Sequence, residues 1–394
     1  MIKDLVNKMN QEMLQLSPSS ILKFNDDVSK IPGIIPLTLG EPDFATPEHV
    51  KTAAIKSIKN DESHYAPTRG IKPLRDAAAN FLNEKYDLNY DPDTEIIMTA
   101  GATGGIYTAL TSILNPGDEV LIPTPIFPLY IPITLLRGAK PVFMDTSKTD
   151  FVLSPEQLEE TLKAHPKTKA IILNFPSNPT GKTYHRDALE KIAKVLKQHE
   201  IFVISDEIYS ELTYDAKHVS IAELIPDQTI LLNGVSKSHA MTGWGIGIMA
   251  APKEITDQLE KIDQFTITST TTNAQAAAAE ALQNGADDAD AMKVEYQKRR
   301  DFLYQALTKL GFGISNPDGA FYIFAKIPAG LIQNSFDFSY DLANKAKVAV
   351  VPGSAFGPGG EGYVRISYAT SMDNLKKAVK NITDYVEKEG QAND

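Results

Sequence analysis

The chain has 394 residues, of which 42% are hydrophobic and 23% are charged, so it is long enough for two domains and too apolar for a disordered or fibrous protein. Its net charge of −11 at pH 7 argues against a nucleic-acid partner. It has no cysteine and no apolar run of membrane-spanning length, which excludes disulfides and thiolate chemistry and favours a cytoplasmic protein without a metal site or a membrane partner.

Strand-like and helix-like segments alternate from about residue 45, which predicts βα units on a mostly parallel sheet. The expected helices cover residues 48–59, 71–86, 103–114, 154–164, 186–198 and 273–283. The expected strands cover residues 95–99, 119–123, 140–144, 170–174, 202–205, 230–233 and 245–250. We therefore predict a large α/β domain at residues 45–289, with helices flanking its sheet.

The pattern changes near residue 290, where a long charged helix begins with MKVEYQKRRDFLYQAL. The segments GAFYIFAKI, VAVVPGSAF and EGYVRISYA then suggest strands, and a last helix is expected near 372–388. We predict a smaller α+β domain at residues 290–394, with an N-terminal arm at residues 1–44 packed against it as part of the same domain.

Four apolar runs of the large domain end abruptly in polar residues. They are EIIMTAGATGGI, AIILNFPSNPTG, IFVISDEIYSEL and TILLNGVSKSHAMTGWG. Because the carboxyl ends of parallel strands lie along one edge of a sheet, that edge would gather a glycine-rich helix start, Asn178, Asp206, Tyr209 and Lys237. These are the groups needed to hold pyridoxal phosphate, so the sequence indicates an enzyme.

Each group also has a simpler interpretation. A lysine after a strand commonly lies on the surface, but the Lys237 amine becomes a nucleophile toward an aldehyde if burial lowers its pKa. Asp206 could be a helix N-cap, or a buried carboxylate that pairs with the pyridinium nitrogen of the cofactor. Tyr209 and Asn178 can both form a hydrogen bond with the ring hydroxyl of the cofactor.

Three further positions fit the same ligand. The GATGGI helix start, which includes Thr103, presents free N–H groups and a positive dipole end to a phosphate, although turns before helices often contain glycine. Phe127 could stack on the ring or belong to the core. Arg365 lies within an alternating strand, where it could clamp a substrate carboxylate or form a salt bridge on a solvated face.

Together these motifs resemble the class I aminotransferases of the aspartate aminotransferase superfamily, which are fold type I pyridoxal phosphate enzymes. The resemblance covers nearly the whole chain and includes, in order, LTLGEPDF, YAPTRG, GATGGI, PTPIFPLY, NFPSNPTG, SDEIY, GVSKSHAMTGW, GAFYIF, VPGSAFG and YVRIS. SKSHAMTGW, SDEIYSELTYD and GEGYVR are most similar to the branch named for N-acetyl-L,L-diaminopimelate aminotransferase, with aromatic aminotransferases close by.

The resemblance implies a role for each position. Lys237 would bind the cofactor aldehyde and move the proton between substrate Cα and cofactor C4′. The ring would be held by Asp206 at its nitrogen, Tyr209 and Asn178 at its oxygen, and Phe127 on its face. The other implied contacts are Ala102, Thr103 and Ser236 with the phosphate; Tyr65 with the phosphate of a second subunit, hence a homodimer; and Gly40, Asn178 and Arg365 with the substrate α-carboxylate.

One position departs from the family. The family usually has MTGWR, in which the arginine pairs with the phosphate, whereas this chain has Gly245. Loss of such a charge-assisted contact costs about 1.5–3 kcal/mol unless another group replaces it. Arg69, which is near Tyr65 in the loop expected to come from the second subunit, or His239 could compensate in part; the alternative is weaker cofactor affinity.

The function implied is an aminotransferase that moves an amino group from an L-amino acid, or an N-acetyl-L,L-diaminopimelate-like donor, to a 2-oxo acid such as 2-oxoglutarate. A β-C–S lyase on the same fold and a non-enzymatic regulator are the alternatives. Residues that could line the substrate side-chain pocket are Ile21, Lys23, Tyr65, Arg69 and Phe356.

Overall fold

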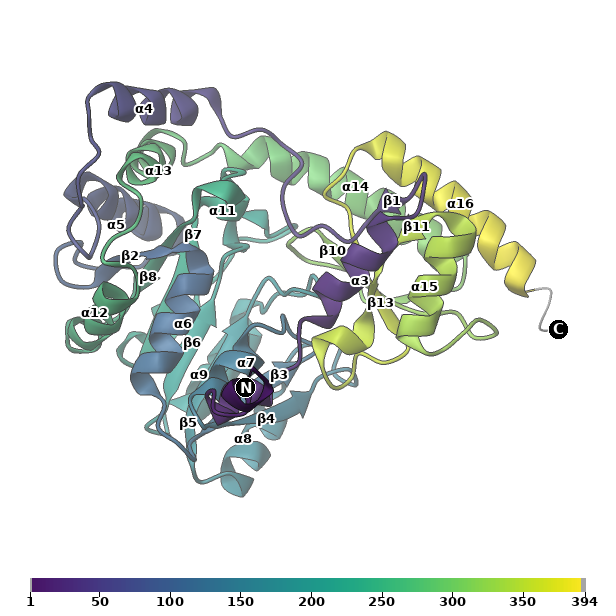
Figure 1. Ribbon diagram of the computed structural model, residues 1–394, viewed down its shortest axis with the longest axis horizontal. Coiled ribbons are helices and arrows are strands. Elements are labelled where there is room, and N and C mark those ends of the chain that lie inside the picture. The colour runs from purple at the N-terminus through teal and green to yellow at the C-terminus, as the bar shows by residue number, and fades with distance from the viewer. Residues whose placement is uncertain (1, 391–394) are drawn as a thin grey trace.

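The computed structural model describes residues 2–390 and has a large α/β part beside a smaller α+β part (Figure 1). This arrangement confirms the predicted fold class. The domain boundaries at residues 44/45 and 289/290 stay predictions. No helix among residues 2–390 is both long enough and apolar enough to cross a membrane.

The large part is built on a seven-stranded sheet. In spatial order its strands are β2 (Ile96–Ala100), β8 (Ile246–Ala250), β7 (Thr229–Gly234), β6 (Phe202–Asp206), β5 (Thr168–Asn174), β3 (Glu119–Thr124) and β4 (Lys140–Asp145). Strand β8 runs antiparallel to both of its neighbours, and all other pairs are parallel. The carboxyl ends of β5, β6 and β7 therefore meet at one edge, as expected from the sequence.

Helices cover both faces of this sheet because its strands are apolar on both sides. In β5, for example, Ile172 faces one helical layer, whereas Ile171 and Leu173 face the other. The first layer contains α6 (Gly101–Ile113), α7 (Tyr130–Leu136) and α12 (Lys253–Ile267). The second contains α4 (Glu48–Lys59), α5 (Lys72–Tyr86), α8 (Pro155–Ala164), α9 (Arg186–Leu196), α10 (Ile221–Leu224) and α13 (Thr272–Asn284).

The small part contains an antiparallel four-stranded sheet. Its strands are, in spatial order, β12 (Val351–Pro352), β13 (Tyr363–Ser367), β10 (Tyr322–Lys326) and β9 (Gly313–Ile314). Three helices accompany it: α14 (Ala289–Lys309), α15 (Ser335–Ala346) and α16 (Met372–Gly390). A short strand near the N-terminus, β1 (Ile35–Pro36), pairs with β11 (Val348–Ala349).

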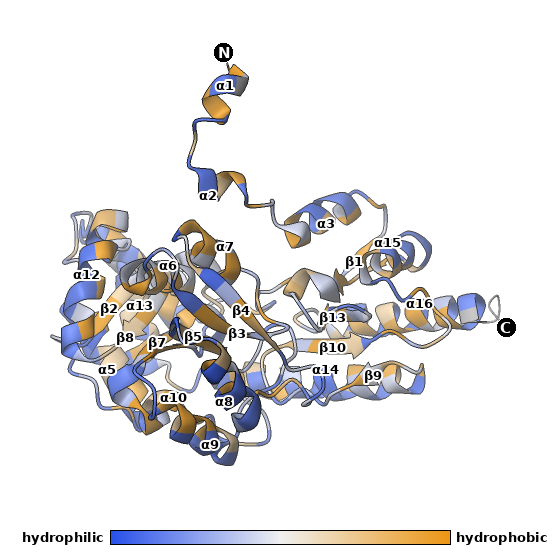
Figure 2. Cartoon of the chain, turned by 90° about the horizontal axis from the view of Figure 1, so that it is seen from below, coloured by the Kyte–Doolittle hydropathy of each residue, from blue (hydrophilic) through white to orange (hydrophobic). Residues whose placement is uncertain are grey.

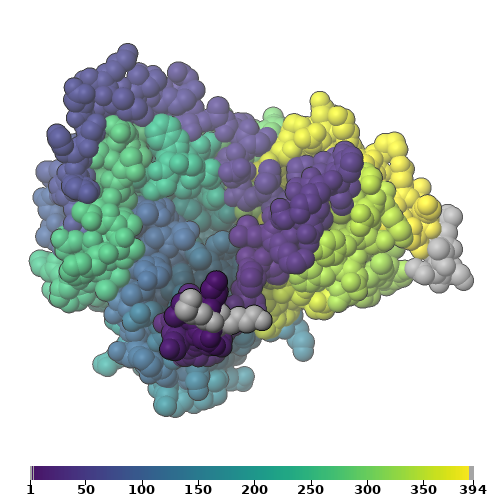
Figure 3. Space-filling view, viewed as in Figure 1, coloured from purple at the N-terminus to yellow at the C-terminus, as the bar shows by residue number. Residues whose placement is uncertain are grey.

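The N-terminal segment packs with the small part through the third of its helices. Phe24 and Val28 of α3 (Ser20–Ser29) are buried against Ala343 and Ala349. Of the two preceding helices, α1 (Ile2–Val6) stands away from the rest of the chain in Figure 2, whereas α2 (Gln11–Leu14) contacts α7 of the large part. Figure 3 shows the whole segment, in purple, lying across the boundary between the two parts.

Candidate functional site

A cavity of about 530 Å³ lies at the carboxyl ends of β5, β6 and β7 and is closed by residues of the N-terminal segment and the small part. It brings together ten of the eleven residues that the resemblance assigns to the cofactor or the substrate α-carboxylate. These are Gly40, Ala102, Thr103, Phe127, Asn178, Asp206, Tyr209, Ser236, Lys237 and Arg365. Tyr65 does not line the cavity and is 88% exposed.

Lys237 lies on α11 (Val235–Ser238), directly after β7. Its Nζ donates a hydrogen bond of 2.7 Å to the Gly40 carbonyl. Burial lowers the pKa of Lys237 to about 8, although the negative charges of Glu41 and Asp206 oppose the shift. A substantial fraction of this amine is therefore neutral near pH 7–8, the state in which an amine attacks a carbonyl carbon.

Asp206 is the last residue of β6 and is 4% exposed. Burial raises its pKa to about 6, although two hydrogen bonds favour the ionised form. Tyr130 Oη donates to Oδ2 at 2.7 Å, and the Ile208 N–H donates to Oδ1 at 3.2 Å. No cation among residues 2–390 forms an ion pair with it, so a cationic ligand nitrogen would relieve the desolvation of this carboxylate.

Tyr130 was not predicted as a site residue, because the segment after PTPIFPLY was not recognised as a helix. It is the first residue of α7 and is fully buried. The sequence feature that could have indicated Tyr130 is its position three residues after Phe127, because residues three apart can face the same side of a helical turn. The two rings lie 6.3 Å apart in a T-shaped arrangement, and both residues line the cavity.

Tyr209 lies opposite a second residue that the sequence analysis did not single out, Tyr322. Their hydroxyl oxygens are 2.8 Å apart. Burial raises the pKa of Tyr209 well above its ordinary value, so this phenol stays protonated and can donate a hydrogen bond. Asn178 is 7% exposed, and its backbone N–H donates to Asn174 Oδ1 at 3.0 Å, which holds the turn after β5 in place.

Arg365 on β13 is 4% exposed, which favours the carboxylate-clamp interpretation over a salt bridge on a solvated face. Its Nη1 donates to Asn178 Oδ1 at 2.9 Å and its Nη2 to the Thr38 carbonyl at 2.6 Å. Burial lowers the pKa of the guanidinium. No carboxylate among residues 2–390 forms an ion pair with Arg365, so this buried cation at the cavity wall fits an anionic ligand.

The start of α6 also forms part of the cavity wall. The first turn of this helix contains Ala102 and Thr103, and its N–H groups have no intrahelical partner. The helix begins directly against β8, since a Cβ on Gly247 would lie 2.4 Å from the Gly101 carbonyl carbon. Ser236 adds a hydroxyl to the same lining, so this part of the wall offers several neutral donors to a phosphate.

Gly245 borders the cavity, and a Cβ there would meet open space. Neither of the residues considered as replacements for an arginine at this position has a free donor. Arg69 uses its guanidinium on Glu260, Asp257 and two backbone carbonyls. His239 is fully buried, with Nδ1 on the Ser238 hydroxyl and Nε2 on the Gly285 carbonyl.

The other pocket candidates separate into two groups. Ile21 lines the cavity, whereas Lys23, two residues along α3, is 73% exposed at its side chain and pairs with Asp27 at 2.8 Å. Phe356 is fully buried behind Arg365, with its ring centroid 5.1 Å from the guanidinium carbon. Among residues 2–390, the only cationic side chains that line the cavity are Lys237 and Arg365.

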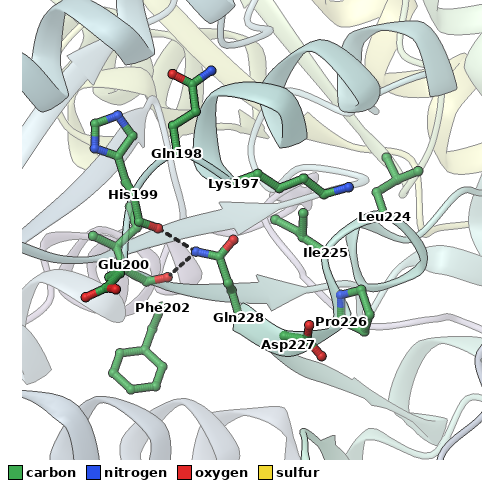
Figure 4. A pocket seen from close by; sticks show the side chains of 11 residues that line it. Lys197, Gln198, His199, Glu200, Phe202, Leu224, Ile225, Pro226, Asp227 and Gln228 are labelled. Carbon is green, nitrogen blue, oxygen red and sulfur yellow. Dashed lines mark hydrogen bonds between the residues drawn. The ribbon is translucent and has the colours of Figure 1, made fainter.

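A larger hollow of about 890 Å³ lies elsewhere, between residues 197–202 and 224–228 (Figure 4). It sits where β6 and β7 begin, away from the edge that carries Lys237 and Asp206. Its central amide, Gln228 Nε2, already donates to the His199 and Ile201 carbonyls at 2.7 and 3.0 Å. This hollow therefore does not compete with the cavity as a functional site.

Comparisons with known proteins agree with this geometry. Residues 32–382 match the family model described as aminotransferase class I and II. The chain is 46% identical over 384 residues to a probable N-acetyl-LL-diaminopimelate aminotransferase of Bacillus subtilis, which covers 98% of this chain and 97% of that protein. It is 40% identical to aromatic-amino-acid aminotransferase 2 of Thermococcus litoralis, over 94% of this chain and 96% of that protein.

Solved structures are similar over the same length. A crystal structure of a Pyrococcus protein named A1 matches with a TM-score of 0.92 and 39% identity, over 96% of this chain and 98% of that one. Aspartate aminotransferase from Thermus thermophilus with maleate matches with a TM-score of 0.91 and 35% identity, over 95% and 99% of the two chains.

Proposed function

Because this chain belongs to the class I and II aminotransferases, which depend on pyridoxal phosphate, we propose that it moves the amino group of an L-amino acid to a 2-oxo acid in a ping-pong cycle at the cavity of Lys237. The observation that carries the proposal is the meeting, in one cavity, of a buried lysine of lowered pKa with the Asp206 carboxylate and the Arg365 guanidinium, neither of which forms an ion pair within residues 2–390. Donor and acceptor would use this one cavity in turn.

The residues present offer a contact to each part of the cofactor, with only neutral donors at the phosphate. Asp206 would hold the pyridine nitrogen, with Tyr130 fixing the carboxylate, and Tyr209 and Asn178 would contact the ring oxygen. When bound, the cofactor supplies the electron sink for loss of a proton from substrate Cα. The remaining proposed contacts are Phe127 with the ring face and Ala102, Thr103 and Ser236 with the phosphate.

Lys237 would attach the cofactor and, once released by the substrate amine, move the proton at substrate Cα. Its pKa near 8 suits both tasks, because the amine can accept a proton near neutral pH and return it. Arg365, with Asn178 and the Gly40 backbone, would bind the α-carboxylate and so orient Cα toward Lys237.

The donor and acceptor are proposed from the relatives. One relative is named for N-acetyl-LL-diaminopimelate and another for aromatic amino acids, so a donor of the first kind and 2-oxoglutarate as acceptor are the substrates to test first. Among residues 2–390, no cation other than Lys237 and Arg365 lines the cavity, and the candidates Lys23 and Arg69 are engaged elsewhere. A second subunit would have to supply such a cation.

We also propose a homodimer with shared active sites. Tyr65 and Phe265 are 88% and 87% exposed, and the N-terminal helices expose Ile2, Leu5 and Val6. Ile2, Leu5 and Val6 share one face of α1, and such an exposed apolar group favours burial against another protein chain. Tyr65 would then reach the phosphate bound by the partner. The cytoplasmic location expected from the sequence stays a prediction.

The decisive experiment is a titration of purified protein with pyridoxal phosphate, followed by a panel of amino donors with 2-oxoglutarate. The visible absorbance of the lysine-bound cofactor should form in wild type and in the surface control Lys23→Ala, and it should be lost in Lys237→Ala. An unchanged absorbance in Lys237→Ala would overturn the proposal. Release of pyruvate and ammonia from cystathionine without an oxo acid would instead indicate a lyase.

A further inference from the structure

Tyr322 is a fully buried residue of β10 that lies at the junction of three parts of the site. Strand β10 pairs antiparallel with β13, with Phe324 opposite Arg365 and Tyr322 opposite Ser367. Residues opposite each other share a face of the sheet, so Tyr322 and Arg365 are diagonal neighbours on the face that lines the cavity. The register of two strands therefore fixes the tyrosine beside the guanidinium.

Each portion of the Tyr322 side chain has its own contact. The Arg365 guanidinium carbon lies 4.5 Å from the ring centroid. The hydroxyl oxygen is 2.8 Å from that of Tyr209. The same hydroxyl packs on Gly40, because a Cβ on that glycine would lie 3.0 Å from it, and the Gly40 carbonyl accepts the hydrogen bond of Lys237.

We propose that Tyr322 is a positioning residue whose ring seats Arg365 and whose hydroxyl orients the Tyr209 hydroxyl toward the cofactor ring oxygen. A phenol has one proton to donate, so Tyr209 can donate to the cofactor only if its own oxygen accepts from Tyr322. The guanidinium above the Tyr322 ring favours this direction, because a nearby cation makes a phenol a stronger donor. This inference rests on the function proposed above.

Two substitutions separate the role of the ring from the role of the hydroxyl. Tyr322→Phe keeps the ring under Arg365 and removes only the hydroxyl. Tyr209 would then donate less effectively to the ring oxygen, and an oxygen anion with a weaker donor holds a nearby proton more tightly. Tyr322→Leu also removes one of the two aromatic faces that contact the guanidinium and leaves that of Phe356.

The first readout is a pH titration of the visible absorbance of the lysine-bound cofactor. In Tyr322→Phe the midpoint should move upward by roughly 0.5–1 pH unit, the size of one buried hydrogen bond. The other titratable or charged side chains that line this cavity are Glu41, Asp206, Tyr209, Lys237 and Arg365, in addition to Tyr130. All of them are unchanged in the variant, so the shift would report the lost hydroxyl.

The second readout is the split between KM and kcat for the amino donor. Tyr322→Phe should lower kcat and change KM by less than about threefold, whereas Tyr322→Leu should raise KM about tenfold because Arg365 loses the nearer of its two aromatic contacts. The matched control is Tyr368→Phe, since Tyr368 is equally buried in the small part and does not line the cavity. It should change neither the midpoint nor KM.

A midpoint in Tyr322→Phe that stays within about 0.2 pH unit of that in Tyr368→Phe would overturn the inference, as would equal KM values in Tyr322→Phe and Tyr322→Leu. Failure of the proposed function is a different result, because the wild type would then form no lysine-bound cofactor to titrate. Circular dichroism of each variant shows whether it folds. If Tyr322→Leu does not fold, the midpoint measured in Tyr322→Phe tests the inference by itself.

Discussion

The Tyr130 hydroxyl and the Asp206 carboxylate form a hydrogen bond of 2.7 Å that joins the start of α7 to the end of β6. This contact supplies one of the two hydrogen bonds to a carboxylate that is 4% exposed. The orientation of Asp206 in the cavity thus depends on a helix that follows Phe127 in the chain.

Tyr130→Phe should leave Asp206 Oδ2 without a partner. Loss of a buried hydrogen bond to a charged group destabilises by about 1.5–3 kcal/mol, and the pKa of Asp206 should rise further. We expect kcat/KM to fall about tenfold. The control is Tyr184→Phe, which removes a buried hydroxyl whose partner is the neutral Leu153 N–H. Equal losses of activity in the two variants would contradict a specific role for Tyr130.

Asp206→Asn tests the cost of burying the carboxylate in the cofactor-free protein. The folded chain holds this proton with a pKa of about 6, above the ordinary value near 4, so wild type should lose stability as pH rises from 4 to 6. Asn does not titrate, so the variant should be more stable than wild type at pH 7 by about 3 kcal/mol, and by little below pH 4. Denaturant unfolding at both pH values measures this difference.

Asp263 provides the matched control for that measurement. Burial raises its pKa to about 6 as well, but Asp263 does not line the cavity. Asp263→Asn should show the same pH dependence with or without cofactor, whereas cofactor should abolish the stability advantage of Asp206→Asn. If cofactor has the same effect on both variants, Asp206 does not pair with the pyridine nitrogen.

Gly247→Ala should disturb the start of α6. The added Cβ would lie 2.4 Å from the Gly101 carbonyl carbon and 2.6 Å from the Ala102 nitrogen, so the helix start must move. We expect a loss of about 1–3 kcal/mol in stability and weaker cofactor binding. Gly243→Ala is the control, since a Cβ there meets nothing within 4 Å. Cofactor affinity that is unchanged in Gly247→Ala would argue against a phosphate at this helix start.

Arg69→Ala should affect stability and not cofactor affinity. Its guanidinium pairs with Asp257 and Glu260, whose side chains are 37% and 33% exposed, so the loss should be about 1–2 kcal/mol. Lys72→Ala, a control at a lysine that is 59% exposed, should change stability much less than Arg69→Ala. A marked loss of cofactor affinity in Arg69→Ala would revive its proposed contact with the phosphate.

The sequence predicted the parts of the site that depend on strand ends. Asn178, Asp206 and Lys237 each come at or after the end of a continuous apolar run, so their meeting at one edge required only a parallel sheet. Tyr130 and Tyr322 contribute through contacts between hydroxyl groups and distant partners. Such contacts depend on which way a side chain points after packing, and an apolar segment rich in aromatic residues does not reveal that direction.

Helix faces show the same limit. Lys23 and Ile21 were both candidates for the pocket, and they lie two residues apart on α3. Residues at that spacing point in different directions around a helix, so only one could line the cavity. The N-terminal segment had to be placed against the small part before Ile21 could be distinguished from the exposed Lys23.

The hydrogen bond from Lys237 to the Gly40 carbonyl has a consequence for how quickly an empty enzyme is loaded. The amine must leave this carbonyl before it can attack an aldehyde, and a protonated amine is the stronger donor. As pH rises through about 8 the amine loses its proton, gains nucleophilicity and is held less firmly by Gly40. The rate at which the cofactor-free enzyme binds its cofactor should therefore rise as pH increases through about 8, because the amine is more nucleophilic and because Gly40 holds it less firmly.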